Sequence, residues 1–487
     1  MMDMKVEVVS KCIILTLALV CSLAVFPVKA QGTTIIVPDN YPNISSAINA
    51  AENGDTIFVR SGSYEGPINE TLAINKTISL VGENKETTKI HLNPPLIPMN
   101  IFTYSYMGYT DAISITADNV KITGLTIETL GGNIVINASK TAIFGNNLGI
   151  GVTINGDQTQ IVDNTLNGFG LFIVGNNTVV AKNTAVGRIE ANGDYNLIAY
   201  NSVNGSAGES IVTHWGNNSV VLSNTIVSAN NWSLALQIRS NSRENLIAKN
   251  NLYGGGLEVS PYTFFNTICG NNLNGWGVGL MGFNNLFYAN QLNYVGIGGG
   301  HGGTVDAAYN TFYRNNFLDI SPEFQVHTKQ PGPITWDNGV EGNFWSNYTG
   351  DGTASYEVFA EYHYFDGAVR EDTNVSLGQD SHPLLTPFDI QSLQISLPAW
   401  AEASLQNLPQ TSPLPPIPTP SLPSQTATAT TPSQLPSQSP PSQQIPHQPP
   451  FPATTVYVAA TLALVITAGL LFYIKQWNKR RRGSLRC

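Results

Sequence analysis

The chain has 487 residues, of which 11% are charged, and its formal net charge is −10. Residues 475–487 contribute +6 and residues 1–30 contribute +1, which leaves −17 for the segment between them. An acidic segment of this kind is not attracted to phosphate backbones, so nucleic acid is excluded as the expected partner. The scarcity of charged helix formers also argues against a mainly helical architecture.

Both ends of the chain carry an apolar run. Residues 1–30 contain IILTLALVCSLAVF and end in the small-x-small sequence VKA, which predicts a secretory signal peptide. Residues 454–477 contain an uncharged run about long enough to cross a bilayer as a helix. The basic residues 478–487 behind it predict a cytoplasmic tail. We therefore expect a single-pass cell-membrane protein with an extracellular N-terminal domain.

Residues 401–453 include the stretch 411–450, which is almost wholly Pro, Ser, Thr and Gln. Such a segment cannot bury a core, and it predicts an extended stalk between the exported domain and the membrane. Several Asn-x-Ser/Thr sequences predict that the exported segment is a glycoprotein. Cys269 and Cys487 would lie on opposite sides of the membrane, so no disulfide is expected between them.

The middle of the chain repeats a short pattern, as in ENLIAKNNL from Glu244 and YNTFYRNNF from Tyr309. A fixed asparagine recurs every 18 to 26 residues, with an apolar residue three positions before it and another two positions after it. Asn, Ser or Thr stands five positions before it, and Asn, Thr, Ser or Gln one position after. The fixed asparagines are Asn146, Asn164, Asn183, Asn201, Asn224, Asn250, Asn271, Asn290 and Asn315.

The repeat favours one kind of solenoid. Its apolar residues are largely β-branched and alternate with polar ones, which is strand periodicity. Successive turns would pair as parallel strands about 4.8 Å apart, and each turn would bury the open face of its neighbour. The sequence therefore predicts an all-β parallel β-helix. We expect the asparagines to occupy the unusual backbone angle of a bend and to bond along the axis as a ladder.

The repeats span residues 119–330. Residues 31–118 are predicted to hold an N-terminal cap and the first turns, with a short helix at 45–51 lying across the open end. Residues 331–400 are predicted to be a closing segment.

TIIVPDNYPNISSAINAAENGDTIFVRSGSYE, the following SLVGEN and the asparagine repeats resemble the NosD-like right-handed parallel β-helix family. This pectin-lyase-like group is also described as carbohydrate-binding and sugar-hydrolase (CASH) domains. The resemblance covers about residues 33–385 and implies a single-stranded right-handed coil. GNFWSNYTG resembles the family's closing segment, but Asn347 replaces an aspartate there, which weakens any role for calcium.

One constellation on the repeats suggests a ligand site. With each turn aligned on its asparagine, Arg188, Gln237 and Glu258 share one outward column, and Glu190 and Arg239 share the next. Carboxylates, guanidinium groups and indole rings are the groups that oligosaccharide sites use. Alternatively, these charges only pair with one another on a solvated face. The candidate carbohydrate-binding residues are Arg188, Glu190, Thr213, His214, Trp215, Trp232, Gln237, Arg239 and Glu258.

The sequence offers little for catalysis or metal binding. The repeats contain few acids and no Asp-Asp or Asp-x-Asp pair, and the histidines are scattered, so no cofactor is expected. We therefore predict a cell-surface protein for binding or display, an adhesion or envelope component that recognises glycans or envelope proteins. The alternatives are an extracellular polysaccharide lyase or glycoside hydrolase and, more weakly, an accessory protein for copper-site maturation.

Overall fold

A computed structural model of the chain describes most of residues 32–410. The described residues are 32–95, 110–168, 170–205, 211–213, 216–228, 234–274, 277–293, 295–297, 307–318, 325–326, 332–362 and 374–410. The predicted signal peptide, membrane helix and basic tail lie outside them, as does the predicted stalk beyond residue 410. Within these ranges, no helix is long and apolar enough to span a bilayer.

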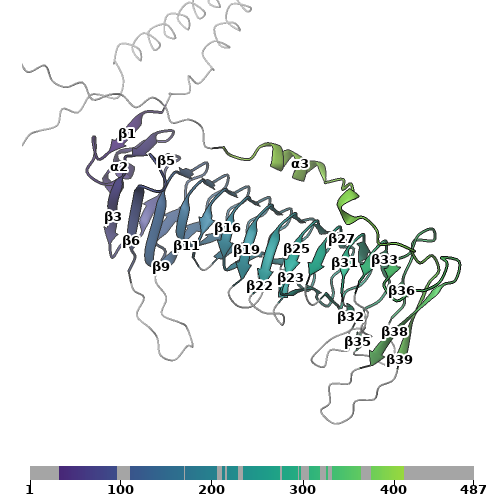
Figure 1. The fold of residues 1–487 in the computed structure, drawn as a ribbon. Helices are drawn as coiled ribbons and strands as arrows, with labels where there is room; N and C mark the ends of the chain where they lie inside the picture. Colours follow the sequence, from purple (N-terminus) through teal and green to yellow (C-terminus); the bar gives the residue numbers. More distant parts are fainter. Residues whose placement is uncertain are drawn as a thin grey trace, which may run out of the picture. The chain divides into compact units, whose positions relative to one another are not determined.

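The described residues form a parallel β-solenoid with three faces, and its turns follow one another along a single axis (Figure 1). Face A is one sheet of 14 strands, each paired in parallel with the equivalent strand of the next turn. Its strands are β1 (Thr34–Val37), β2 (Thr56–Val59), β5 (Ser79–Gly82), β8 (Lys121–Thr123), β10 (Ala142–Phe144), β12 (Gln160–Val162), β15 (Val179–Ala181), β18 (Leu197–Ala199), β21 (Val220–Leu222), β24 (Leu246–Ala248), β27 (Thr267–Cys269), β30 (Leu286–Tyr288), β33 (Asn310–Tyr313) and β36 (Ile334–Thr335).

Face B follows face A in each turn, and the long strands β9 and β11 continue from it onto face C. Its strands are β3 (Gly62–Ile68), β6 (Thr88–Asn93), the first parts of β9 (Thr126–Ile136) and β11 (Asn147–Ile154), β13 (Thr165–Leu166), β16 (Thr184–Val186), β19 (Ser202–Gly205), β22 (Thr225–Ser228), β25 (Asn251–Tyr253), β28 (Asn272–Asn274), β31 (Gln291–Leu292), β34 (Asn316–Phe317) and β37 (Phe344–Trp345).

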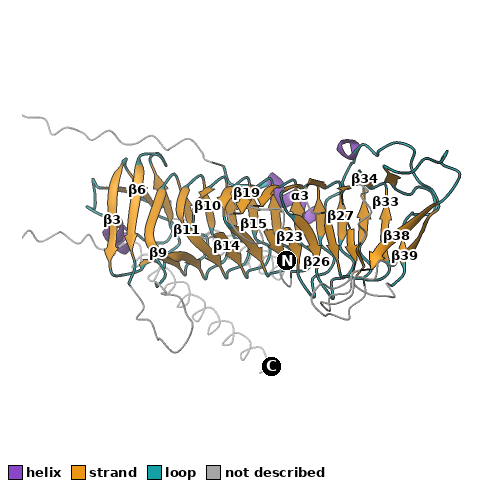
Figure 2. Cartoon of the chain, turned by 60° about the horizontal axis from the view of Figure 1, so that its bottom comes forward, coloured by secondary structure: helices purple, strands orange, loops and turns teal. Residues whose placement is uncertain are grey.

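Face C closes each turn, and Figure 2 shows the strands side by side along the coil. It ends in an antiparallel hairpin of β38 and β39. Its strands are β4 (Leu72–Ile74), β7 (Ile113–Ile115), the second parts of β9 and β11, β14 (Gly170–Ile173), β17 (Arg188–Ala191), β20 (Ile211–Thr213), β23 (Leu234–Ile238), β26 (Gly256–Val259), β29 (Val278–Leu280), β32 (Val295–Ile297), β35 (Gln325–Val326), β38 (Tyr356–Tyr362) and β39 (Asn374–Asp380).

The interior is one continuous apolar core. Equivalent inward residues stack in register from turn to turn, as Ile143, Ile161 and Val180 do on face A, and all three are 0% exposed. Toward the C-terminal end, aromatic residues replace aliphatic ones in the core. Phe287 and Phe312 stack there with their ring centroids 4.5 Å apart. The strand alternation that the sequence predicts thus produces a core filled by side chains.

A helix lies at the N-terminal end, where the sequence predicts one. Helix α2 (Ile44–Ala50) starts at Asn43, whose Oδ1 accepts the backbone N–H of Ser46 at 2.8 Å. This is a side-chain N-cap. Its buried residues Ile44, Ala47 and Ile48 join the main core cluster.

The nine repeat asparagines lie in one column at the corner between faces A and B. In each turn, the backbone N–H and the side-chain Nδ2 of the column asparagine both donate to Oδ1 of the column asparagine in the next turn. From Asn224 to Asn250 these distances are 2.9 and 3.0 Å. Nδ2 of Asn224 also donates to the carbonyl of Ile198 at 2.8 Å. Because the column asparagines are at most 2% exposed, these bonds satisfy backbone groups that water cannot reach.

The predicted backbone role of these asparagines is wrong. The left-handed conformation lies at the residue immediately before each of them, for example at Asp163, Lys182 and Tyr200, with φ of 55°, 58° and 57°. Intrinsic preference would favour Gly or Asn at such an angle, yet Asp, Lys and Tyr occupy it here. The column asparagine is therefore required for its hydrogen bonds and not for its tolerance of the bend.

The other corner of face A carries a second column, five residues before the first. Asn245, Asn266 and Asn285 donate in the same way, and Asn310 accepts the bonds from Asn285. Asn266 reaches Oδ1 of Asn285 at 3.0 Å from N and 2.9 Å from Nδ2. Both ends of most face A strands in the repeats are thus held by side-chain hydrogen bonds between turns.

The first column ends at a carboxylate. Asn315 donates to Asn343, and the N–H of Asn343 donates to Oδ2 of Asp380 at 2.7 Å. Trp345 Nε1 donates to the same oxygen at 2.8 Å, and the N–H of His382 donates to Oδ1 at 3.0 Å. Burial raises the pKa of the Asp380 carboxyl, although these donors oppose the shift.

The C-terminal segment covers the outer side of face A. Outward residues such as Leu197, Leu222 and Cys269 are apolar and at most 4% exposed, and they form a second hydrophobic cluster with side chains from residues 388–408. We call residues 388–408 the strap. It contains η1 (Ile390–Ser392) and helix α3 (Ala399–Gln406), which lies alongside the coil (Figure 1). The predicted start of the stalk at residue 401 is therefore wrong, because α3 continues past it.

The strap runs back along the coil toward earlier turns. Arg314 lies over the ring of Phe388, Leu393 lies against Gly270, and Trp400 meets Tyr195 edge to face at 5.9 Å. The closing segment of the sequence analysis therefore has two parts. Residues 332–362 and 374–380 complete the coil, and the strap packs against it.

Candidate functional site

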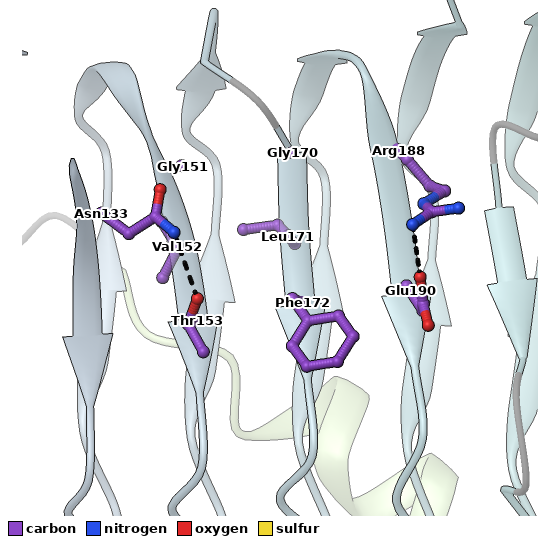
Figure 3. Close-up of a pocket in the computed structure, with 9 residues that line it drawn as sticks. All are labelled: Asn133, Gly151, Val152, Thr153, Gly170, Leu171, Phe172, Arg188 and Glu190. Carbon is purple, nitrogen blue, oxygen red and sulfur yellow. Dashed lines mark hydrogen bonds and ion pairs between the residues drawn. The ribbon is translucent and has the colours of Figure 1, made fainter. Parts of the chain in front are cut away.

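A shallow hollow lies on face C, across β9, β11, β14 and β17 (Figure 3). Its volume is about 100 Å³. We call it the groove, and it is lined by Asn133, Gly151, Val152, Thr153, Gly170, Leu171, Phe172, Arg188 and Glu190.

The groove exists because two outward positions lack side chains. Asn133 pairs with Gly151, and Gly170 pairs with Arg188, so polar side chains stand at both ends of a row with glycines between them. A Cβ on Gly151 would lie 2.6 Å from Oδ1 of Asn133. Gly170 has φ of 104°, and a Cβ there would lie 2.1 Å from the carbonyl oxygen of Arg188. The floor is therefore bare backbone.

The second outward row supplies one wall of the groove. Thr153, Phe172 and Glu190 follow one another in register on β11, β14 and β17. Phe172 is 39% exposed, so its ring can meet a ligand. Asn133 Nδ2 donates to Thr153 Oγ1 at 3.5 Å, which orients the amide at the far end.

Arg188 and Glu190 form an ion pair at the other end of the groove. The guanidinium lies 2.7 Å from Glu190 Oε2, and the arginine side chain is 45% exposed whereas the glutamate is 11% exposed. The buried carboxylate positions the guanidinium, a planar group with several donors. The sequence left open the alternative that these charged residues pair with one another. Arg188 and Glu190 do form such a pair, and the pair also lines the groove.

The predicted alignment of the site is shifted by two residues. Glu190 lies in one column with Val212, Gln237 and Glu258, whereas the sequence alignment placed Arg188 there. The cause is the corner that leads to face A, which is two residues longer after Gln237 than after Glu190. A shift of two preserves the inward and outward faces, so only the column changes.

Gln237, Arg239 and Glu258 form a separate cluster on later turns. Gln237 Nε2 donates to Glu258 Oε1 at 2.7 Å, and Arg239 Nε donates to Gln237 Oε1 at 2.6 Å. Ser260 Oγ donates to the same Glu258 oxygen at 2.5 Å. The amide of Gln237 thus bridges the arginine and the glutamate, and the cluster is internally hydrogen-bonded.

The remaining candidate residues are only partly described. Thr213 lies on β20, between the groove and the Gln237 cluster, and its side chain is not described. His214, Trp215 and Trp232 lie outside the described residues. Among the residues that are described, no three His, Cys, Asp or Glu side chains converge as a metal site would require.

Sequence reasoning missed Asn133, Gly151, Gly170 and Phe172. The signal lay in the outward positions of successive turns, where two glycines replace side chains beside an exposed aromatic ring. The turn that contains Asn133 precedes the first repeat asparagine, so an alignment on the asparagines did not include it.

Similarity to known proteins is found among solved structures and not by sequence. No protein-family profile matches the sequence, and no curated protein sequence is similar to it. Solved structures are similar in fold. They include a PL6 alginate lyase in complex with a trisaccharide, which is 11% identical, covers 74% of this chain and 95% of its own, and has a TM-score of 0.44.

Two further solved structures resemble the coil. The catalytic unit of the GH87 α-1,3-glucanase from Streptomyces thermodiastaticus is 12% identical, with 61% of this chain and 66% of that chain covered and a TM-score of 0.42. The Dettilon tailspike protein is 14% identical, with 64% and 66% covered and a TM-score of 0.40. At these identities the likeness concerns the β-solenoid fold alone, and membership of the NosD-like family stays a prediction.

Proposed function

We propose that the groove binds carbohydrate without cleaving it. The observation that carries this proposal is the bare glycine floor between the Asn133 amide and the Arg188 guanidinium, beside the exposed ring of Phe172. A sugar presents hydroxyls at its rim and C–H groups on its flat faces. Amide and guanidinium groups match the hydroxyls, and an aromatic ring matches a C–H face.

The dimensions of the groove support a short oligosaccharide. Asn133 and Arg188 stand three turns apart, which corresponds to about 14 Å at the usual strand spacing. The ligand would lie along the coil axis, across the strands.

The arrangement of carboxylates favours binding over hydrolysis. Glu190 and Glu258 share one column but are three turns apart, again about 14 Å. Glycoside hydrolysis uses two carboxyl groups about 5–9.5 Å apart. These two residues therefore do not form such a pair, and each has polar partners of its own.

The proposal includes the predicted location. A cleaved signal peptide and one C-terminal membrane helix would tether the solenoid to the outer surface of the cell, as an adhesion or envelope component of the NosD-like type. Helix α2 would shield the first turn from edge pairing, which open strand ends require.

A glycan array probed with the full-length chain in detergent tests this function, followed by titration of the glycans that bind. The variants Gly151→Val and Phe172→Ala should each lower the affinity at least tenfold, because the first fills the floor and the second removes the ring. Gly279→Val is the matched control. It lies further along face C, where a Cβ meets nothing closer than 4.0 Å, and it should bind like wild type.

Two outcomes contradict the proposal. One is a wild-type chain that binds no glycan on the array. The other is turnover of a polysaccharide, detected as new reducing ends or unsaturated products, that disappears in Glu190→Gln or Glu258→Gln. The second result would establish the lyase or hydrolase alternative instead.

A further inference from the structure

Face B carries a regular, uncharged row of outward side chains, independent of the groove. On β13, β16, β19, β22, β25 and β28, the first outward residues are Thr165, Thr184, Ser202, Thr225, Asn251 and Asn272, paired in register from turn to turn. Two residues further on stand Asn167, Val186, Asn204, Val227, Tyr253 and Asn274. We call these twelve residues the strip.

The strip is accessible along its length and bounded at both ends. Thr184 and Ser202 are exposed, and Val186, Val227 and Tyr253 are 42, 40 and 39% exposed. Figure 1 shows β16, β19, β22 and β25 side by side on this face.

Each boundary is a contact with another segment. Before the strip, Asn147 Nδ2 donates to Glu86 at 3.3 Å. Beyond it, after the turn that contains Gln291, the side chain of Asn316 bonds the backbone of Phe388, where the strap begins.

We propose that the strip binds a linear, uncharged polysaccharide lying along the coil axis. Its rows repeat about every 4.8 Å, so six turns span about 24 Å. A ligand that repeats itself can contact every row, and each added contact is intramolecular, which raises the overall affinity without any strong single site.

The chemistry of the strip selects an uncharged polymer. None of its twelve residues is charged, although the exported segment carries −17 once the +6 and +1 of the chain ends are removed from −10. An acidic polymer would find no cation on the strip and would be repelled by the rest of the domain. Hydroxyl and amide groups match sugar hydroxyls, and Val186, Val227 and Tyr253 match C–H faces.

The strip is also rigid, which lowers the entropic cost of binding. Thr, Ser and Asn are short, and the χ1 angles of Thr and Val are restricted by β-branching. Their side chains therefore lose little freedom on contact, unlike the Lys, Glu and Gln side chains of most exposed surfaces.

The test is co-sedimentation of the full-length chain in detergent with insoluble cellulose, chitin and linear β-1,3-glucan, with pectate as the acidic comparison. The chain is made in a host without N-glycosylation, because Asn204 begins an Asn-Gly-Ser sequence within the strip. Wild type should bind at least one neutral polymer, and the affinity for its soluble oligomers should rise at least tenfold as the oligomer lengthens.

Two double variants with equal charge locate the binding surface. Ser202→Lys with Thr225→Lys places two cations on the strip and should lower binding at least tenfold. Tyr200→Lys with Ser223→Lys places them at the preceding corners of the same two turns. Lys182 and Lys249 already occupy those positions in neighbouring turns, so this control should fold and bind like wild type.

Three outcomes overturn the inference. They are no binding to any neutral polymer, equal binding by the two double variants, and loss of polymer binding only in Gly151→Val. The last result would assign the polymer to the groove, so the two binding proposals fail separately.

Discussion

Faces A and B are built from strands of similar length, yet the outer side of face A is covered by another segment and the outer side of face B is exposed. On face A the outward residues are apolar, as Leu197, Ala199 and Leu222 are, and the strap covers them. On face B the outward residues are Thr, Ser and Asn with a few apolar neighbours, and they remain accessible. The solenoid therefore fixes only the inward positions, and the outward positions decide what each face meets.

The difference between the two faces is visible in the three-residue sequences of their strands. Face A strands read LIA, VVL and TIC, with two or three consecutive apolar residues, which is the pattern of a strand buried on both sides. Face B strands read TAV, SVN and NLY around one inward residue. An apolar run in such a repeat thus indicates a covering segment elsewhere in the chain.

The largest expected effect separates the corner from the strip within one turn. Asn250→Leu removes the acceptor of two donors from Asn224 and the side-chain donor to the carbonyl of Val221. Each buried group without a partner costs about 1–3 kcal/mol, so we expect a loss of about 4 kcal/mol or more in unfolding free energy. The adjacent outward variant Asn251→Leu should cost less than about 1 kcal/mol. Equal urea midpoints for the two variants would refute the structural role of the column.

The next effect compares the two faces directly. Ala199→Lys places a charge under the strap, where Ala199 is 0% exposed, and should cost about 3 kcal/mol or detach the strap. Ser202→Lys, three residues later on the exposed strip, should stay within about 0.5 kcal/mol of wild type. Thermal unfolding and limited proteolysis of residues 388–408 measure both. A stable, protease-resistant Ala199→Lys chain would show that the strap does not seal face A.

The smallest effect concerns the strap alone. Leu393→Ala should weaken its docking by about 2 kcal/mol, enough to raise the open population more than tenfold. Cys269, 0% exposed on the covered face, reports this opening, because burial raises the pKa of its thiol to about 11 and suppresses its reaction.

Cysteine labelling followed by peptide mass spectrometry should show faster modification of Cys269 in Leu393→Ala. The control Leu385→Ala changes a side chain that is 60% exposed and should label like wild type. Unchanged labelling in both variants would mean that Leu393 does not hold the strap closed.

The repeat made the coil predictable from the sequence, but the backbone conformation at the corners and the strap were not predicted. Matched positions around Asn201 or Asn250 predict strand, corner and core, because the same side chain must meet its copy in every turn. The left-handed residue before each asparagine was not predictable, because Asp163, Lys182 and Tyr200 share no chemical feature. The strap was missed because its partners on face A are far from it in sequence.

The candidate site was predictable only as a face. Arg188 and Glu190 lie on face C as expected, because inward and outward positions follow from alternation. The residues that share a column with them were not predicted correctly. The corner between face C and face A differs by two residues between turns, and an alignment on Asn201 and Asn250 does not account for this difference. The glycine floor depends on which outward rows lie next to one another, which the sequence alone did not predict.

The buried carboxylate of Asp380 gives the coil a terminus. Every asparagine in the column accepts hydrogen bonds from one neighbouring turn and donates hydrogen bonds to the other. This pattern alone would allow the solenoid to have any number of turns. Both oxygens of Asp380 accept from backbone or indole N–H groups, so this side chain receives hydrogen bonds and passes none to a further turn. The ladder of amide hydrogen bonds therefore has a defined last rung at Asp380, and adding or removing an upstream turn would leave that rung in place.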